Sequence, residues 1–129
     1  MNKGGRPPSQ RQLRVGEALR HRLAEVLLRG ELHDPVIEEA NLSVAEVRTS
    51  PDLRHAVVYV SALGQPDVPA DVLEGLERAA PRVAGRIARD MHLKHAPRFR
   101  FVADNAINEA ATIDRLLREA GIGGRDHEP

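Results

Sequence analysis

Two runs rich in β-branched residues, separated by one tight turn, constrain the fold of this chain more than any other feature. The first run covers residues 41–50 and the second covers residues 55–63. β-Branched and aromatic side chains favour extended backbone because they pack well on a pleated surface. The sequence Ser50-Pro51-Asp52 between the runs has the residue types of a turn. We therefore expect two antiparallel strands over 41–50 and 55–63.

Amphipathic helices are predicted on both sides of this hairpin. In the first helix, expected from an N-cap at Ser9 to near Gly30, apolar or small residues recur at steps of three and four: Leu13, Gly16, Leu19, Leu23 and Leu27. A second helical pattern begins at Pro69 or Ala70 and gathers another set on one face: Leu73, Leu76, Ala80, Val83, Ile87 and Met91. Both faces are predicted to be core.

Pro81 lies inside the second helical pattern, where it lacks an N–H and its ring collides with the carbonyl of Glu77. The helix must therefore kink or break there, and we expect two helices that meet at an angle. His95-Ala96-Pro97 ends the second of them. Residues 98–102 then predict a third strand with Phe99 and Phe101 on one face, and residues 106–120 predict a final helix closed by Gly121.

These elements predict an α+β domain in which a three-stranded sheet packs on helices. Its order is helix, strand, strand, kinked helix pair, strand and an extra C-terminal helix. We expect a flexible basic arm over 1–8, one domain over 9–120 and a disordered tail over 121–129, because the ends contain too few apolar residues to bury a core. The 129 residues contain no cysteine, which excludes disulfides, a thiol nucleophile and cysteine-ligated zinc. No stretch approaches the ~18 apolar residues of a membrane span, so we expect a cytoplasmic protein.

The formal net charge is zero, but charge is segregated along the chain. Residues 1–29 carry seven Lys or Arg against two acidic residues, and 81–101 carry six against one. Residues 30–80 carry three basic against ten acidic residues, and 102–129 carry three against six. Local positive fields attract phosphate even when the total charge vanishes, so the basic segments are predicted to bind nucleic acid.

At 100° per residue, the arginines of both helices form rows opposite the apolar faces. On the first helix the row is Arg11, Arg14, Arg22 and Arg29, with Arg20 left near the apolar side. On the second it is Arg78, Arg82, Arg86 and Arg89, and the last three have few acidic neighbours four residues away. Guanidinium groups pair bidentately with phosphate. The candidate RNA-binding residues are Arg11, Arg14, Arg22, Arg78, Arg82, Arg86, Arg89, Lys94, Arg98 and Arg100.

Three motifs resemble those of the ribosome-binding factor A family. Residues 50–61, with the sequence SPDLRHAVVYVS, resemble its hairpin motif S-x-D-L-x-x-A-x-V-Y-V-S. Residues 93–101 with Asp104 resemble its L-(R/K)-x-x-P-x-L-x-F-x-x-D run, and residues 113–117 resemble its I-x-x-L-L helix. The resemblance implies a type II KH-like fold. One departure is Ala79-Ala80-Pro81, which stands at the helix kink where the family usually carries Ala-x-Gly.

By this resemblance the chain is expected to act in ribosome biogenesis as a non-enzymatic assembly factor without a cofactor. It would bind 16S rRNA and free small (30S) subunits during late maturation, aid processing of the 16S rRNA 5′ end, and support growth in the cold. Maturation GTPases are further possible partners, and the chain is expected to be a monomer.

Other interpretations of the same residues stay open at this stage. Tyr59, Phe99 and Phe101 are expected in the core or sheet and not as stacking platforms for bases. His92 and His95 have the spacing of a metal pair but no evident third ligand, and Ser61, Asp104 and His55 could be imagined as a triad without a nucleophile elbow. The acidic middle of the chain could instead be the functional surface of a ferredoxin-like protein-interaction module.

Overall fold

The computed structural model describes residues 7–106. Most of the predicted arm, the predicted helix beyond residue 106 and the predicted tail therefore lie outside the described residues. The elements are α1 (Gln10–Leu28), α2 (Pro35–Glu39), β1 (Leu42–Thr49), β2 (His55–Ala62), α3 (Ala70–Asp90), β3 (Arg98–Ala103) and the short 3-10 helix η1 (Asp104–Ala106). No helix within this part of the chain is long and apolar enough to cross a membrane.

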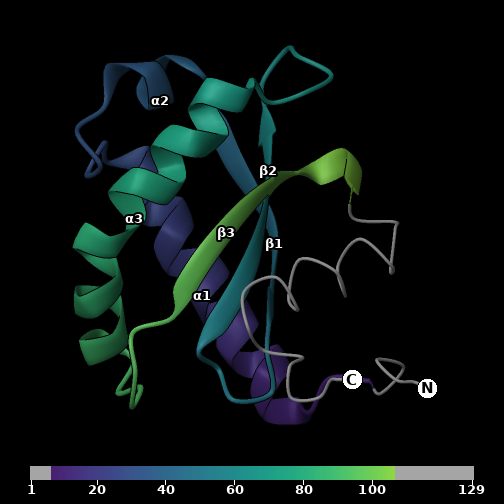
Figure 1. Ribbon diagram of the computed structural model, residues 1–129, viewed down its shortest axis with the longest axis vertical. Helices are drawn as coiled ribbons and strands as arrows, with labels where there is room; N and C mark the ends of the chain where they lie inside the picture. The colour runs from purple at the N-terminus through teal and green to yellow at the C-terminus, as the bar shows by residue number, and fades with distance from the viewer. Residues whose placement is uncertain (1–6, 107–129) are drawn as a thin grey trace.

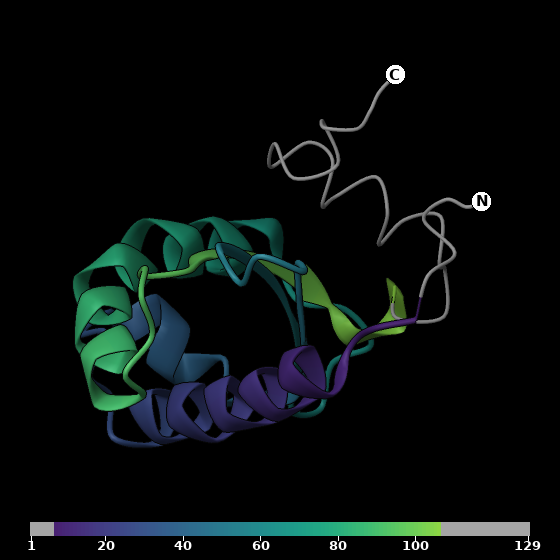
Figure 2. The ribbon, with the colours of Figure 1, turned by 90° about the horizontal axis from the view of Figure 1, so that it is seen from below.

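The three strands form one sheet in the order β1-β2-β3. β1 and β2 pair antiparallel, as the turn chemistry predicts, and β3 pairs parallel to β2. A parallel pair needs a long crossover connection, and α3 provides it. Figures 1 and 2 show α1 and α3 packed side by side on the same face of the sheet, with α1 next to β1 and α3 next to β3.

Local sequence fixes where α1 begins and how closely it approaches β1. The Ser9 hydroxyl accepts a hydrogen bond from the Gln12 amide, and the Gln12 side chain accepts one from the Ser9 amide, which makes a capping box. A Cβ atom at Gly16 would lie 2.6 Å from the carbonyl oxygen of Val47. Only glycine therefore allows α1 to lie this close to the backbone of β1.

The apolar stripe of α1 differs slightly from the prediction. Gly16, Leu19, Leu23 and Val26 are buried, but Leu13 is 53% exposed because the first turn of α1 extends beyond the core. On the sheet, the helix-facing residues of β2 and β3 complete the core, and they include Phe99 and Phe101 as predicted.

The predicted helix pair is a single helix, α3, that continues through Pro81. Its axis nevertheless bends midway, as both ribbon views show (Figures 1 and 2), so the predicted kink is confirmed but the two-helix description is wrong. Ala80 and Val83, on either side of the proline, are buried against the core, and this packing holds the two halves together.

The sequence analysis also missed α2, because five residues are too few to show a helical period. Its signals are local. The Asp34 side chain accepts a hydrogen bond from the Val36 amide, and Pro35 stands in the first turn. This short helix therefore begins in the usual way but leaves no periodic pattern in the sequence.

Candidate nucleic-acid interface

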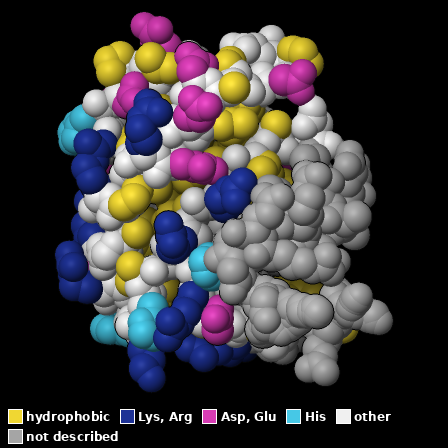
Figure 3. Space-filling view, viewed as in Figure 1, with side chains coloured by type: hydrophobic (Ala, Val, Ile, Leu, Met, Phe, Trp, Pro, Cys, Tyr) yellow, Lys and Arg dark blue, Asp and Glu magenta, His cyan; other side chains and the backbone are white. Residues whose placement is uncertain are grey.

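The fold places the acidic and the basic segments of the sequence at opposite ends of the molecule. Figure 3 shows acidic side chains gathered toward the top of this face and Lys, Arg and His side chains along its left side and bottom. The top is the end where α2 lies and α3 begins, and the bottom is the end where α3 finishes (Figure 1). The exposed acids at the top include Glu38, Glu39, Asp67, Asp71 and Glu74. α3 thus carries acidic residues in its first half and arginines in its second.

Exposed cations at the lower end come from segments that meet there. We call Arg54, Arg89, Lys94 and Arg98 the basic surface. They stand in the turn before β2, at the end of α3, in the following loop and at the start of β3. The parallel pairing brings two of these segments together, because Arg98 donates its amide to the carbonyl of Arg54 at 2.8 Å. No ion pair within residues 7–106 involves any of these four residues.

Arg54 is a cation that the sequence analysis did not select. Its guanidinium Nη2 lies 3.1 Å from Nε2 of His95, which links the turn before β2 to the loop before β3. Arg54 belongs to the hairpin motif and directly precedes His55, the residue that pairs with Arg98 in the sheet. The sequence therefore contained a reason to select Arg54, but this reason could be recognised only once the parallel register of β2 and β3 was known.

His55 lies beneath this cluster of cations. Burial lowers the pKa of His55, the charges of Arg98 and Arg54 lower it further, and Asp52 opposes them. The Nδ1 atom is buried and has no hydrogen-bond partner within the described chain. The imidazole is therefore held neutral near pH 7, and its protonation would be favoured by an anion placed beside the cluster.

A cleft of about 600 Å³ runs between the bend of α3 and strand β3. Its apolar lining consists of small or cyclic side chains together with one aromatic ring: Ala80, Pro81, Ala84, Ala96, Pro97 and Phe99. Its polar lining consists of His55, Glu77, Arg98 and Arg100. Of the predicted kink residues Ala79, Ala80 and Pro81, the last two therefore border a space large enough for part of a nucleotide chain.

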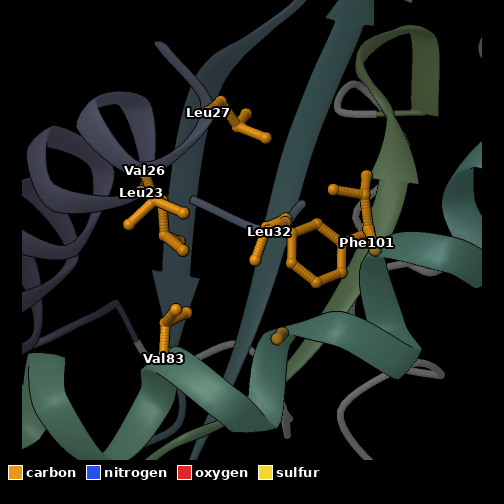
Figure 4. Close-up of a pocket in the computed structure, with 8 residues that line it drawn as sticks. Leu23, Val26, Leu27, Leu32, Val83 and Phe101 are labelled. Atoms are coloured by element: carbon orange, nitrogen blue, oxygen red, sulfur yellow. The ribbon is translucent and has the colours of Figure 1, made fainter. Parts of the chain in front are cut away.

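A second, apolar pocket lies between α1, α3 and β3, where Leu23, Val26 and Val83 face Leu32 and Phe101 (Figure 4). Its volume is about 10 Å³, no more than the roughly 10–15 Å³ that a single water molecule requires. It is part of the packed core and has no room for a ligand.

Three of the predicted RNA-binding arginines are instead engaged between α1, α3 and the segment that connects α1 to α2. Arg22 pairs with Asp90 at 3.4 Å, Arg86 pairs with Glu31, and Arg82 donates to the carbonyl oxygen of Leu32. We call Arg22, Arg82 and Arg86 the seam arginines. The sequence analysis found few acidic neighbours of Arg86 within its own helix, and Glu31 was missed because it lies 55 residues away.

The remaining predicted cations also fall into two groups, one residue beside a carboxylate of the chain and three that make no ion pair within residues 7–106. Arg100 is turned away from Phe99 and Phe101, as the alternation predicts, and its side chain lies 3.4 Å from Glu77. Arg11, Arg14 and Arg78 are exposed and make no ion pair within residues 7–106. Arg11 and Arg14 stand where α1 begins, at the same end of the molecule as the basic surface (Figure 1), and Arg78 stands halfway along α3.

The geometry of the described residues gives no support to the alternative chemistries. Within that part of the chain no group of three potential metal ligands exists, so His92 and His95 find no third ligand there. Ser61 shares a hydrogen bond with Ser43 at 2.9 Å, and six strand positions, roughly 20 Å, separate it from His55. A triad of Ser61, Asp104 and His55 is therefore excluded.

The order of helix, hairpin, bent helix and parallel third strand defines a type II KH-like domain, here with a cationic end. Residues 11–117 match the family described as Ribosome-binding factor A. The chain belongs to the ribosome-binding factor A family, and it is accordingly a ribosome-binding factor and not an enzyme.

Relatives and a solved structure agree with this assignment. The ribosome-binding factor A of Methylobacterium sp. strain 4-46 is 53% identical over 115 residues, which are 89% of this chain and 82% of that protein. The one from Paramagnetospirillum magneticum is 45% identical over 130 residues, 100% of this chain and 91% of that protein. The crystal structure of ribosome-binding factor A from Thermus thermophilus matches with a TM-score of 0.60 and 29% identity, over 74% of this chain and 98% of that chain.

Proposed function

We propose that this protein binds precursors of the small (30S) ribosomal subunit by contacting 16S rRNA with its basic surface. Through this binding it would assist late maturation of the subunit in the cytoplasm, including processing of the 16S rRNA 5′ end, and would support growth in the cold. The observation that carries the proposal is the group of exposed cations, Arg54, Arg89, Lys94 and Arg98, which make no ion pair within residues 7–106.

The chemistry of this surface suits phosphate and RNA shape better than base sequence. Arginine forks and a lysine supply charge-assisted donors for phosphate oxygens. Stacking platforms are lacking in the described chain, because Tyr59 is 0%, Phe99 8% and Phe101 5% exposed. The cleft beside Pro81 offers room for backbone or ribose next to Arg98 and His55.

The acidic end should fix the orientation of the protein on the subunit. The exposed carboxylates gathered around α2 and the start of α3 would repel rRNA phosphate. We propose that this end faces away from the rRNA and remains available to maturation GTPases, and that the protein binds as a monomer. A ferredoxin-like interaction module acting through the same acids would instead bind its partner with little dependence on the basic surface.

Sedimentation tests the proposal directly. Cell lysate is fractionated on a sucrose gradient, and the protein is located across free small subunits, large subunits and complete ribosomes. The proposal expects the protein with free small subunits, depleted from complete ribosomes, and released as salt is raised from about 50 to about 200 mM, because phosphate contacts are salt-sensitive. Equal distribution across all fractions, or binding unaffected by salt, would contradict it.

A further inference from the structure

The turn between β1 and β2 brings an acidic residue next to the basic surface. Asp52 is exposed and stands two residues before Arg54. A carboxylate at this place repels the phosphate that the surface is proposed to attract. Within residues 7–106 Asp52 forms no ion pair with any Lys, Arg or His side chain. Its negative charge therefore needs an explanation other than pairing with a neighbouring cation.

The Asp52 carboxylate makes its hydrogen bonds within the turn itself. Its Oδ1 atom accepts a hydrogen bond from the Ser50 hydroxyl at 2.7 Å and another from the Arg54 amide at 3.1 Å. Ser50 is 0% exposed, and its hydroxyl oxygen accepts a hydrogen bond from the His55 amide at 3.1 Å. The Ser50 amide in turn donates to the His55 carbonyl at 2.9 Å. One carboxylate oxygen and one hydroxyl thus fix the amides of Arg54 and His55.

Leu53, the residue directly before Arg54, shows that the backbone of this turn is strained. Its φ of +63° lies in the left-handed region, which residues with a branched or bulky side chain rarely adopt. The Leu53 side chain is buried, and its amide donates to the Ser50 carbonyl at 3.0 Å. Strain of this kind persists only where surrounding contacts hold it, and it is frequent at functional sites. The turn therefore holds Arg54 in a conformation that costs free energy to maintain.

The rest of Arg54 is fixed by the start of β3 and the loop before it. The Arg54 carbonyl accepts a hydrogen bond from the Arg98 amide at 2.8 Å, and Nη2 of Arg54 lies 3.1 Å from Nε2 of His95. Because a guanidinium only donates, the His95 ring accepts through Nε2. The Arg54 side chain makes no other hydrogen bond and no ion pair within residues 7–106. The guanidinium is therefore held in place with its remaining N–H donors available to a ligand.

We propose that Asp52 is a positioning residue, whose carboxylate holds the Arg54 amide so that the Arg54 guanidinium meets one phosphate of the rRNA backbone. The inference rests on the proposed function and deepens it, because it assigns to Arg54 a phosphate contact that is built before the RNA arrives. A donor that is already fixed loses less conformational freedom on binding.

The ionisation of Asp52 agrees with this role. Burial works against the charged form, but hydrogen bonds from the Ser50 hydroxyl and the Arg54 amide, together with the charges of His55 and Arg54, leave the pKa of Asp52 below its usual value. The group is therefore a carboxylate at neutral pH, and hydrogen bonds to a charged acceptor are stronger than those to a neutral one.

This role reverses the sign that charge alone predicts. Asp52→Asn and Asp52→Ala remove the same negative charge, but only the asparagine amide oxygen can still accept from the Ser50 hydroxyl and the Arg54 amide. We expect Asp52→Asn to bind small subunits at least as tightly as the parent protein, and Asp52→Ala to bind about fivefold more weakly. Pelleting with purified 30S subunits at about 50 mM salt measures both. Charge alone would make both variants bind more tightly.

The salt dependence of binding separates positioning from a general loss of structure. In Asp52→Ala, as in Arg54→Gln, the negative slope of log affinity against log salt should become shallower by about 0.9, because one phosphate is no longer neutralised. In an Arg54→Gln background, Asp52→Ala should lower the affinity no further. Far-UV circular dichroism shows whether each variant is folded. Arg54→Gln keeps the test decisive if Asp52→Ala unfolds, because it leaves the backbone contacts of the turn in place.

Three results would overturn the inference. They are equal affinity of Asp52→Ala and Asp52→Asn, an unchanged slope in Arg54→Gln, and losses that simply add in the double variant. A parent protein that binds no small subunits would contradict the proposed function together with this inference, so the two failures are distinguishable.

Discussion

The seam arginines and the basic surface both consist of cationic side chains, but they differ in the contacts that these side chains make. Arg22, Arg82 and Arg86 bind acceptors of their own chain at Asp90, Leu32 and Glu31. The cations of the basic surface make no ion pair within residues 7–106. An arginine row on a helix therefore does not identify an interface by itself. What distinguishes the two regions, among residues 7–106, is whether another segment of the chain supplies a carboxylate or carbonyl oxygen to the guanidinium; Arg54 meets only the imidazole of His95.

The largest effect is expected from reversing charge on the basic surface. Lys94→Glu with Arg98→Glu replaces two attractions for phosphate by two repulsions, and affinity for 30S subunits should fall about 100-fold, or about 2.7 kcal/mol. Arg20→Glu with Arg29→Glu is the control, because it changes net charge equally at two α1 arginines that already have acidic partners. Filter binding or pelleting with purified subunits measures both. Equal losses in the two variants would show that net charge, and not location, governs binding.

A seam substitution should act on stability and not on binding. Arg82→Met keeps the aliphatic stem but removes the donor to the Leu32 carbonyl. Because hydrogen bonds from charged groups contribute about 1.5–3 kcal/mol and this side chain is largely exposed, we expect a loss of about 1.5 kcal/mol in the free energy of unfolding by urea. Affinity for the subunit should stay within about threefold. Unchanged stability together with a tenfold loss of affinity would instead identify Arg82 as a residue that contacts the subunit, like those of the basic surface.

Releasing a seam arginine from its ion pair should raise affinity for the subunit, by less than the charge reversal on the basic surface lowers it. Asp90→Asn removes the carboxylate that pairs with Arg22, and a pair this exposed contributes only about 0.5 kcal/mol to stability. The freed guanidinium and the removal of a negative charge should raise affinity for the subunit roughly threefold. Isothermal titration at about 50 mM salt measures the change. Weaker binding would mean that the ion pair itself positions Arg22 for RNA.

The smallest effect is a pH dependence at His55. Burial and neighbouring arginines lower the pKa of His55 in the folded protein, so its contribution to stability is complete above the unfolded value of about 6.5 and is lost as pH falls below it. Urea unfolding at about pH 7.5 and about pH 5.5 should show a small decrease that is absent in His55→Gln. Bound RNA should raise the pKa of His55, which NMR titration of the imidazole can follow. A His55 pKa that is unchanged on binding would place the rRNA phosphates away from the cleft.

Most of the fold can be predicted from the sequence, because most of its elements are specified by residues that are close together in the chain. The capping box at Ser9, the turn at Ser50-Pro51-Asp52 and the strand preference of residues 55–62 each act over a few residues and agree with the tertiary structure. The parallel pairing of β3 could not be derived in this way, because it depends on the direction in which α3 returns the chain. Pro81 correctly predicts a bend, but whether a helix breaks there depends on the packing of Ala80 and Val83.

The candidate interface was less predictable than the fold. A helical projection reports which side chains share a face of one helix, and it carries no information about acceptors brought by other elements. Glu31 and Leu32 come from a connecting segment, and their partners Arg86 and Arg82 are 55 and 50 residues away. Arg54 was missed for the same reason, since only the parallel register places it beside the loop before β3.

The salt dependence of subunit binding tests the central claim most directly. Two variants each remove two positive charges: Arg89→Gln with Arg98→Gln on the basic surface, and Arg22→Gln with Arg86→Gln among the ion-paired seam arginines. If the basic surface contacts phosphate, the negative slope of log affinity against log salt should become shallower by roughly 1.8 in the first variant, which is about 0.9 for each phosphate that is no longer neutralised. In the second variant the slope should stay unchanged. Equal slopes for the first variant and the parent protein would contradict the account.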